Sequence, residues 1–153
     1  MTTTLTTRTG RALVPSMLFD RLVRRTVADD HLDQDLAERV VDQALAFLAA
    51  CARNTSAPLA PSELVDLGWH AFLLHTRDYA GFCEDIAGRF LHHVPIEPDA
   101  VGAPESARDT IRRTIEAIEN AGFTVDPDLW PHADAADCTG CHNGCHDDPP
   151  PAR

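Results

Sequence analysis

The chain has 153 residues, a formal net charge of −11 and no lysine. Its length fits one domain with a core of several helices, and its 44% hydrophobic and 24% charged residues are ordinary for a globular protein. An acidic chain with scattered arginines has no electrostatic footprint for nucleic acid or for an anionic membrane. We therefore expect neither of them as a partner.

The sequence also indicates the cellular compartment. No apolar run approaches the roughly 20 residues that span a bilayer, and the first residues, MTTTLTTR, do not resemble a secretion signal. We predict a cytoplasmic protein, in which thiols stay reduced. The five cysteines then indicate metal or redox chemistry more than a disulfide scaffold. Cys51 and Cys83 fall among apolar helical residues and are interpreted as small core side chains.

Four helices are predicted in chain order, after a Thr-rich N-terminal arm over residues 1–14 that we expect to be flexible. The first covers residues 16–29, and the second, capped by Asp33, runs to residue 53 with a wide apolar stripe. The third, over residues 62–86, is apolar on nearly all sides, which is typical of a helix in the middle of a fold. The fourth covers residues 105–121, with Gly122 as its stop.

These elements predict an all-α fold, because no strand run or internal repeat stands out in the sequence. We expect a small bundle of about four main helices, forming a helical domain over residues 15–130. An irregular Cys/His-rich tail follows over residues 131–153. It is rich in aspartate and proline and has little to bury.

The tail places three thiols and two imidazoles within nine positions: Cys138, Cys141, His142, Cys145 and His146. Cys-x-x-Cys spacing lets two thiolates reach one ion from a single turn, and the two intervening glycines permit the backbone reversal. Burial cannot order so polar a segment, whereas structural zinc contributes about 10–16 kcal/mol in small peptides. We predict a zinc site made by the three cysteines with His146 or His142, or with a ligand from the helical body.

Three alternatives remain for the tail. An iron–sulfur cluster with an open iron, or a copper–thiolate site, would use the same three cysteines. Residues 138–142 also match the pattern of c-type haem attachment, although that attachment takes place outside the cytoplasm. The last alternative is a solvated acidic tail that binds nothing, since such compositions often stay disordered.

A second group of candidate ligands lies in the helical domain. Asp66 and His70 are four residues apart and share a helix face, and His93 could supply a third ligand. His75, on another face, is a further candidate, and zinc, iron and copper all accept such a set. The sequence nevertheless favours a structural pair, because a histidine buried beside an aspartate satisfies its hydrogen bond.

Part of the chain resembles a known family. The run VDLGWH at residues 65–70, then Tyr79, Cys83 and the run RFLHH at residues 89–93, is similar to the conserved block of the glycine-rich-domain-containing-protein-like family. Residues 114–123, Pro127 and Trp130 extend the resemblance, which covers residues 61–130. That family tends to have a second histidine where this chain has Phe72, and its glycine-rich domain is absent. The resemblance implies a helical fold and a polar centre of Asp66, Trp69 and His70, but no reaction. Trp69 and Tyr79 are themselves interpreted as core aromatics with satisfied polar groups.

Three functional hypotheses follow. The favoured one is a metal-binding module in which the tail metal, zinc before iron–sulfur or copper, stabilises a small helical protein that binds a protein partner or small molecule, or delivers the ion. The alternative is a small metal-dependent enzyme with an open site of Asp66, His70 and His93, for which His75 is a further candidate ligand. The third is a structural subunit with an incidental tail. Common hydrolase, kinase and dehydrogenase motifs are absent from the sequence, so whether the chain is an enzyme stays open.

Overall fold

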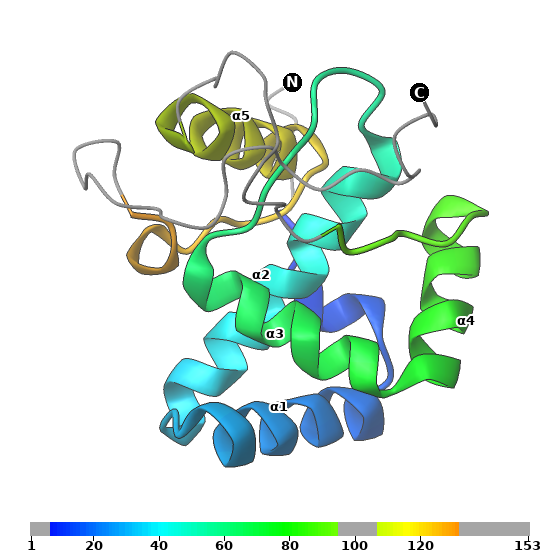
Figure 1. Cartoon of the computed structure of the whole chain (residues 1–153), viewed down its shortest axis with the longest axis vertical. Helices are drawn as coiled ribbons and strands as arrows, with labels where there is room; N and C mark the ends of the chain where they lie inside the picture. The colour runs from blue at the N-terminus through cyan, green and yellow to red at the C-terminus, as the bar shows by residue number, and fades with distance from the viewer. Residues whose placement is uncertain (1–6, 95–106, 132–153) are drawn as a thin grey trace, which may run out of the picture.

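The computed structural model describes residues 7–94 and 107–131 (Figure 1). These ranges contain five α-helices: α1 (Ser16–Asp30), α2 (Gln34–Arg53), α3 (Glu63–Leu74), α4 (Thr76–Ala87) and α5 (Ala107–Asn120). Two short 3-10 helices, η1 (Gly10–Leu13) and η2 (Pro127–Leu129), flank them. The predicted all-α class is therefore confirmed for the residues described. Among these residues, no helix has both the length and the apolar character needed to cross a membrane.

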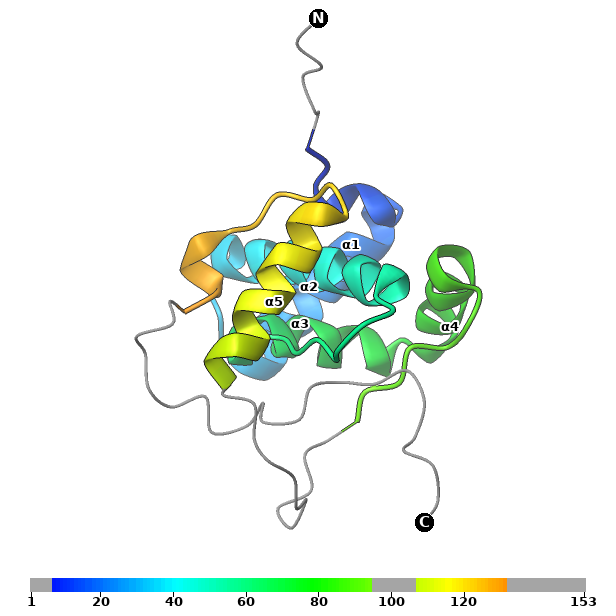
Figure 2. The same ribbon diagram turned by 90° about the horizontal axis from the view of Figure 1, so that it is seen from above.

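Helix α2 runs through the middle of the molecule, with the other helices around it (Figures 1 and 2). It contacts η1 and all four of the other α-helices, and its residues 43–51 are buried without exception. Five buried alanines in α2 let its neighbours approach closely. The central helix is therefore α2, and not the segment over residues 62–86 that we expected in this position.

That expected third helix is in fact two helices, α3 and α4. The backbone leaves the helical conformation at His75, where φ is −95° and ψ is 66°. Helix α4 then turns so that Tyr79 and Phe82 pack against Phe72 of α3. Each of the two helices buries one face, which explains why the combined sequence looks apolar on all sides. The turn also brings Tyr79 beside Trp69, which a continuous helix would hold about 15 Å away.

The described part of the expected N-terminal arm, residues 7–14, lies against the helical body. Arg8 forms an isolated bridge with the segment after α5, donating its N–H to the carbonyl of Gly122 (2.9 Å) and accepting from the N–H of Thr124 (3.0 Å). Gly10 touches the backbone of α2 so closely that a β-carbon there would lie 1.9 Å from the carbonyl oxygen of Asp42. A glycine is therefore required for η1 to pack on α2.

Side chains of α2 also hold the segment that follows α5. The buried Gln43 accepts hydrogen bonds from Trp130 Nε1 (2.9 Å) and the N–H of Asp126 (3.0 Å), and donates to the carbonyl of Thr124 (2.9 Å). Arg39 makes a two-point contact with the Asp126 carboxylate, at 2.7 and 3.0 Å. The segment from Thr124 to Trp130 is therefore bound to the helical body.

Helices α2 and α3 meet at Gly68, and this contact can be tested by substitution. A β-carbon at Gly68 would lie 2.9 Å from Cβ of Ala44 and 3.0 Å from the carbonyl oxygen of Val40. We expect Gly68→Ala to lower the free energy of unfolding by about 1–3 kcal/mol, because the two helices must move apart. A β-carbon at Gly81 in α4 would have no neighbour within 4 Å. Gly81→Ala should therefore raise the free energy of unfolding by about 0.5–1 kcal/mol. Denaturant unfolding followed by circular dichroism measures both, and equal effects would contradict the close approach.

The contact between Arg39 and Asp126 predicts a pH dependence. The Arg39 guanidinium holds the pKa of Asp126 below its ordinary value, mainly through their hydrogen bonds. The ion pair therefore stabilises the fold above the unfolded-state pKa of about 4 and is lost as the pH falls through the lower folded-state pKa. We expect Asp126→Asn to be less stable than the wild type at pH 7 and equally stable once both are acidified below that range. If Asp126→Asn is still less stable than the wild type in acid, the loss of the ion pair does not explain its effect.

Candidate metal centre

Helix α3 presents the first two side chains of the centre. The helix begins after Ser62, whose hydroxyl accepts a hydrogen bond from the N–H of Val65 (3.2 Å). This capped start fixes the first turn, so Asp66 and His70 project from one face, one helical step of four residues apart. The Asp66 side chain is 27% exposed and that of His70 is 53% exposed. The two groups therefore form an edge of the centre that solvent can reach.

The third side chain, His93, comes from an irregular segment after α4. That helix ends at Gly88 in the left-handed conformation (φ 65°), which reverses the chain. The Arg89 guanidinium then donates to the carbonyls of Ala52 and Cys51 at the end of α2, both at 3.4 Å. His93 lies with its ring against Trp69, at 4.4 Å between ring centres, and its side chain is 18% exposed.

Three polar side chains converge where these segments meet. His93 Nε2 lies 2.8 Å from Asp66 Oδ1, and His70 Nε2 lies 3.2 Å from Asp66 Oδ2. The two Nε2 atoms lie 3.0 Å from each other. Asp66, His70 and His93 form the group in the described part of the chain whose geometry suits a metal ion. The structure thus brings together three of the four residues that the sequence nominated in the helical domain.

Hydrogen bonds alone do not account for all three contacts. Each Nε2 carries either one proton or one lone pair, and an ionised carboxylate only accepts. When both histidines donate to Asp66, the two Nε2 atoms face each other as two donors at 3.0 Å. When one histidine donates to the other, the accepting nitrogen has only its lone pair to offer Asp66. At most two of the three contacts are therefore favourable at once.

A divalent cation would remove this conflict, because all three lone pairs could point at it. Zinc–nitrogen bonds of about 2.0–2.1 Å place neighbouring ligand atoms about 2.9–3.4 Å apart, depending on the geometry. The two Nε2 atoms lie 3.0 Å apart, within this range. One Asp66 oxygen lies 2.8 Å from Nε2 of His93, and the other lies 3.2 Å from Nε2 of His70. Two histidines with one carboxylate suit zinc with an open position, and also iron(II). The donor set and its spacing thus fit one transition-metal ion.

The remaining sequence candidates lie elsewhere. His75 sits at the junction of α3 and α4, with its Nδ1 3.0 Å from the carbonyl of Ala71, and is not part of the three-residue group. The tail ligands Cys138, Cys141, His142, Cys145 and His146 lie outside the described residues, so the zinc site there stays a prediction. Cys51 and Cys83 are buried, as expected of core side chains.

The polar contacts of Trp69 and Tyr79 were only partly expected. Trp69 Nε1 donates to the Tyr79 hydroxyl at 3.0 Å, which agrees with core aromatics whose polar groups are satisfied. The Tyr79 hydroxyl also donates to the carbonyl of Leu91, two residues before His93. The sequence contained no signal for this second bond, because it depends on the turn at His75.

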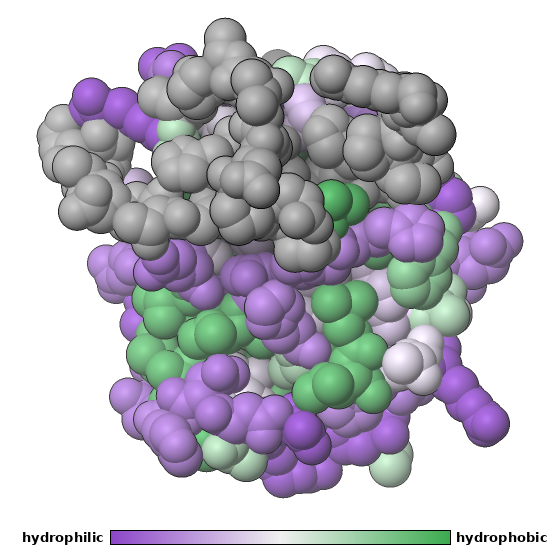
Figure 3. All heavy atoms as spheres, in the orientation of Figure 1, coloured by the Kyte–Doolittle hydropathy of each residue, from purple (hydrophilic) through white to green (hydrophobic). Residues whose placement is uncertain are grey.

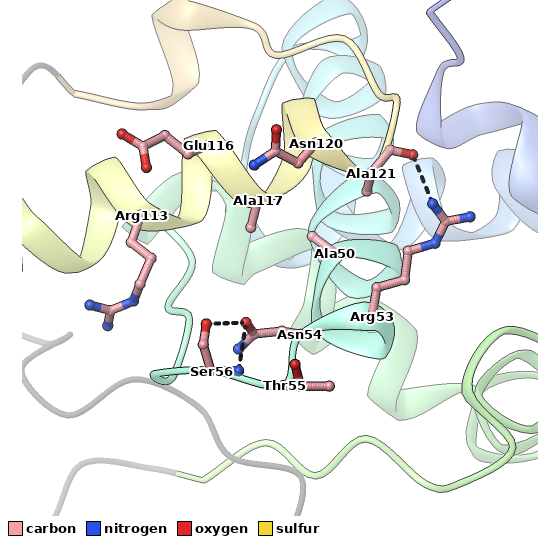
Figure 4. Close-up of a pocket in the computed structure, with 10 residues that line it drawn as sticks. All are labelled: Ala50, Arg53, Asn54, Thr55, Ser56, Arg113, Glu116, Ala117, Asn120 and Ala121. Atoms are coloured by element: carbon pink, nitrogen blue, oxygen red, sulfur yellow. Dashed lines mark hydrogen bonds between the residues drawn. The ribbon is translucent and has the colours of Figure 1, made fainter.

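Other surface features lie apart from this centre. A pocket of about 350 Å³ lies between the end of α2 and α5, with Arg53 and Arg113 at its opposite ends (Figure 4). Both guanidinium groups already bind backbone carbonyls, those of Ala121 and Pro58. On the face carrying α1 and α3, polar side chains separate the apolar areas from one another (Figure 3). Neither feature gathers polar atoms around one point as the metal centre does.

Comparison with known proteins identifies the family. A family model described as UCP032817-like matches residues 10–122, which is most of the chain, so the chain belongs to the UCP032817-like family. The resemblance to the glycine-rich-domain-containing-protein-like family was therefore wrong, because the motif at residues 65–93 that carried it lies within this match. Neither the curated proteins nor the solved structures include a match to the chain.

Proposed function

We propose that this protein binds one divalent transition-metal ion, zinc before iron(II), through the Asp66 carboxylate and Nε2 of His70 and His93. The observation that carries the proposal is the convergence of two imidazole nitrogens and one carboxylate, in contacts of 2.8–3.2 Å that hydrogen bonds cannot all satisfy at once. Zinc is preferred because it imposes no fixed geometry and accepts three protein ligands of these types.

The cysteine tail is a second proposed site, supported by its spacing alone. Three thiolates and a histidine there would form a closed structural zinc site, whereas the helical centre has three protein ligands. The two sites therefore have different chemistry and can be separated by mutation. We propose that both would work in the cytoplasm, where thiols and iron(II) stay reduced.

Metal content of matched full-length variants tests the helical centre. The variants Asp66→Asn, His70→Ala and His93→Ala should each lose more affinity than the roughly 10–100-fold that removal of an outer-shell partner costs. His92→Ala removes the exposed neighbouring imidazole and should bind as the wild type does. A background with Cys138, Cys141 and Cys145 all changed to serine removes the tail thiolates. Elemental analysis, native mass spectrometry and Co²⁺ titration give stoichiometry and affinity.

The outcomes separate the two sites. One equivalent retained in the serine background and lost on His93→Ala supports the helical centre. If His92→Ala and His93→Ala bind equally, or if metal is lost only with the cysteines, the proposal for Asp66, His70 and His93 is wrong.

A metal-dependent enzyme is the second candidate function, and the exposure of His70 favours it. Three protein ligands with one of them 53% exposed leave room for water or substrate on the ion. An open site predicts that azide changes the visible spectrum of the Co²⁺-loaded protein in the serine background. A spectrum unaffected by saturating azide would favour a closed centre and a binding role. His92→Ala should respond to azide as the wild type does.

A further inference from the structure

We propose that Tyr79 is a positioning residue of the metal centre, whose hydroxyl fixes the place of His93 through the carbonyl of Leu91 and the indole of Trp69. This inference rests on the proposed metal site and adds to it a residue that does not touch the ion. It explains how one ligand from an irregular segment meets two ligands from a helix.

His93 needs such a tether because its backbone has no regular secondary structure. Residues 90–94 lie outside any helix or strand, so no ladder of backbone hydrogen bonds sets their position. A ligand must be held within about 0.5 Å of its productive place for a site to bind well. The contacts of Leu91 and Trp69 therefore decide whether His93 reaches Asp66.

The Tyr79 hydroxyl supplies that tether with both of its hydrogen-bonding functions. It accepts from Trp69 Nε1 at 3.0 Å and donates to the carbonyl of Leu91. All three residues are about 1% exposed, so water does not compete for these bonds. Burial, as the main cause, raises the pKa of Tyr79 far above its ordinary value. The hydroxyl therefore keeps its proton and remains a donor at any working pH.

Trp69 completes the link from the hydroxyl to the ligands. Its indole packs against the His93 ring at 4.4 Å, and its backbone precedes His70 in α3. The Phe47 ring centre lies 5.3 Å from that of the indole. The Phe72 ring centre lies 5.2 Å from that of Tyr79, with the rings edge-on. These contacts hold both aromatic rings in place. A single hydroxyl thus joins α3, which carries two ligands, to the segment that carries the third.

The substitution Tyr79→Phe removes this hydroxyl and keeps the ring. The Trp69 N–H and the Leu91 carbonyl then lose a buried partner, and the segment that carries His93 is no longer fixed. Asp66 and His70 keep their places, because α3 positions them. We expect the affinity for Co²⁺ to fall about 10–100-fold, the usual loss when an outer-shell partner of a ligand is removed.

A double-mutant cycle with His93→Ala isolates the positioning role. Co²⁺ titrations in the serine background compare the wild type, Tyr79→Phe, His93→Ala and the double variant. If Tyr79 acts through His93, Tyr79→Phe weakens binding in the wild type and has little effect, less than about threefold, when His93 is already absent. The visible spectrum of Co²⁺-loaded Tyr79→Phe should also approach that of His93→Ala, because a nitrogen ligand is lost.

Thr114→Val is the matched control for the loss of a buried hydroxyl. Thr114 in α5 accepts from the N–H of Ala60 (3.1 Å) and donates to the carbonyl of Thr110 (2.9 Å), the same pair of bonds made by a residue that is not part of the metal centre. The Thr114→Val substitution should lower the stability of the protein while leaving its Co²⁺ affinity unchanged. Circular dichroism confirms that each variant is folded at the titration temperature.

Each outcome decides the question. If the wild type binds no metal in the serine background, the proposed function itself fails. If the wild type binds Co²⁺ and Tyr79→Phe binds it equally well, the positioning role is wrong and the metal site stands. The same conclusion follows if Tyr79→Phe lowers the Co²⁺ affinity by the same factor with and without His93. If Tyr79→Phe does not fold, the same cycle with Trp69→Phe, which removes the indole N–H, gives the decision by the same criteria.

Discussion

The reversal of the chain at His75 is the constraint on which the candidate centre depends. The backbone leaves the helix there, and α4 folds back against α3 instead of extending it. Tyr79 then reaches Trp69, and the chain that leaves α4 returns toward α3 with Leu91 and His93. Without this turn, Asp66 and His70 would remain a helical pair on the surface, with no third group beside them.

The geometry of the centre shifts the balance between the structural and the metal-binding interpretations. A buried aspartate and histidine that only satisfied each other would need one hydrogen bond. Here two imidazoles meet one carboxylate and also each other, at 3.0 Å between their Nε2 atoms, while His70 stays largely exposed. If these side chains only satisfied buried hydrogen-bonding atoms, nothing would favour placing the Nε2 atoms of two histidines in contact. Coordination of a cation would give all three side chains one shared role.

Sequence patterns predicted the parts of the fold that depend on local chemistry. The expected helices over residues 16–29 and 105–121 correspond to α1 and α5 within two residues at each end, and Asp33 caps α2 as its position suggested. The turn at His75 was missed because apolar periodicity does not distinguish one buried helix from two that each bury a face. The sequence named Asp66, His70 and His93 but could not rank them, because the decisive distances join residues 27 and 23 positions apart.

Location of the ion itself tests the central claim most directly. Crystals of the metal-loaded protein with its three tail cysteines changed to serine allow an anomalous difference map at the absorption edge of the bound metal. The account predicts one peak about 2.0–2.2 Å from Nε2 of His70, Nε2 of His93 and a carboxylate oxygen of Asp66. A loaded crystal with no peak between these atoms, or with its peak elsewhere on the helical body, would contradict it.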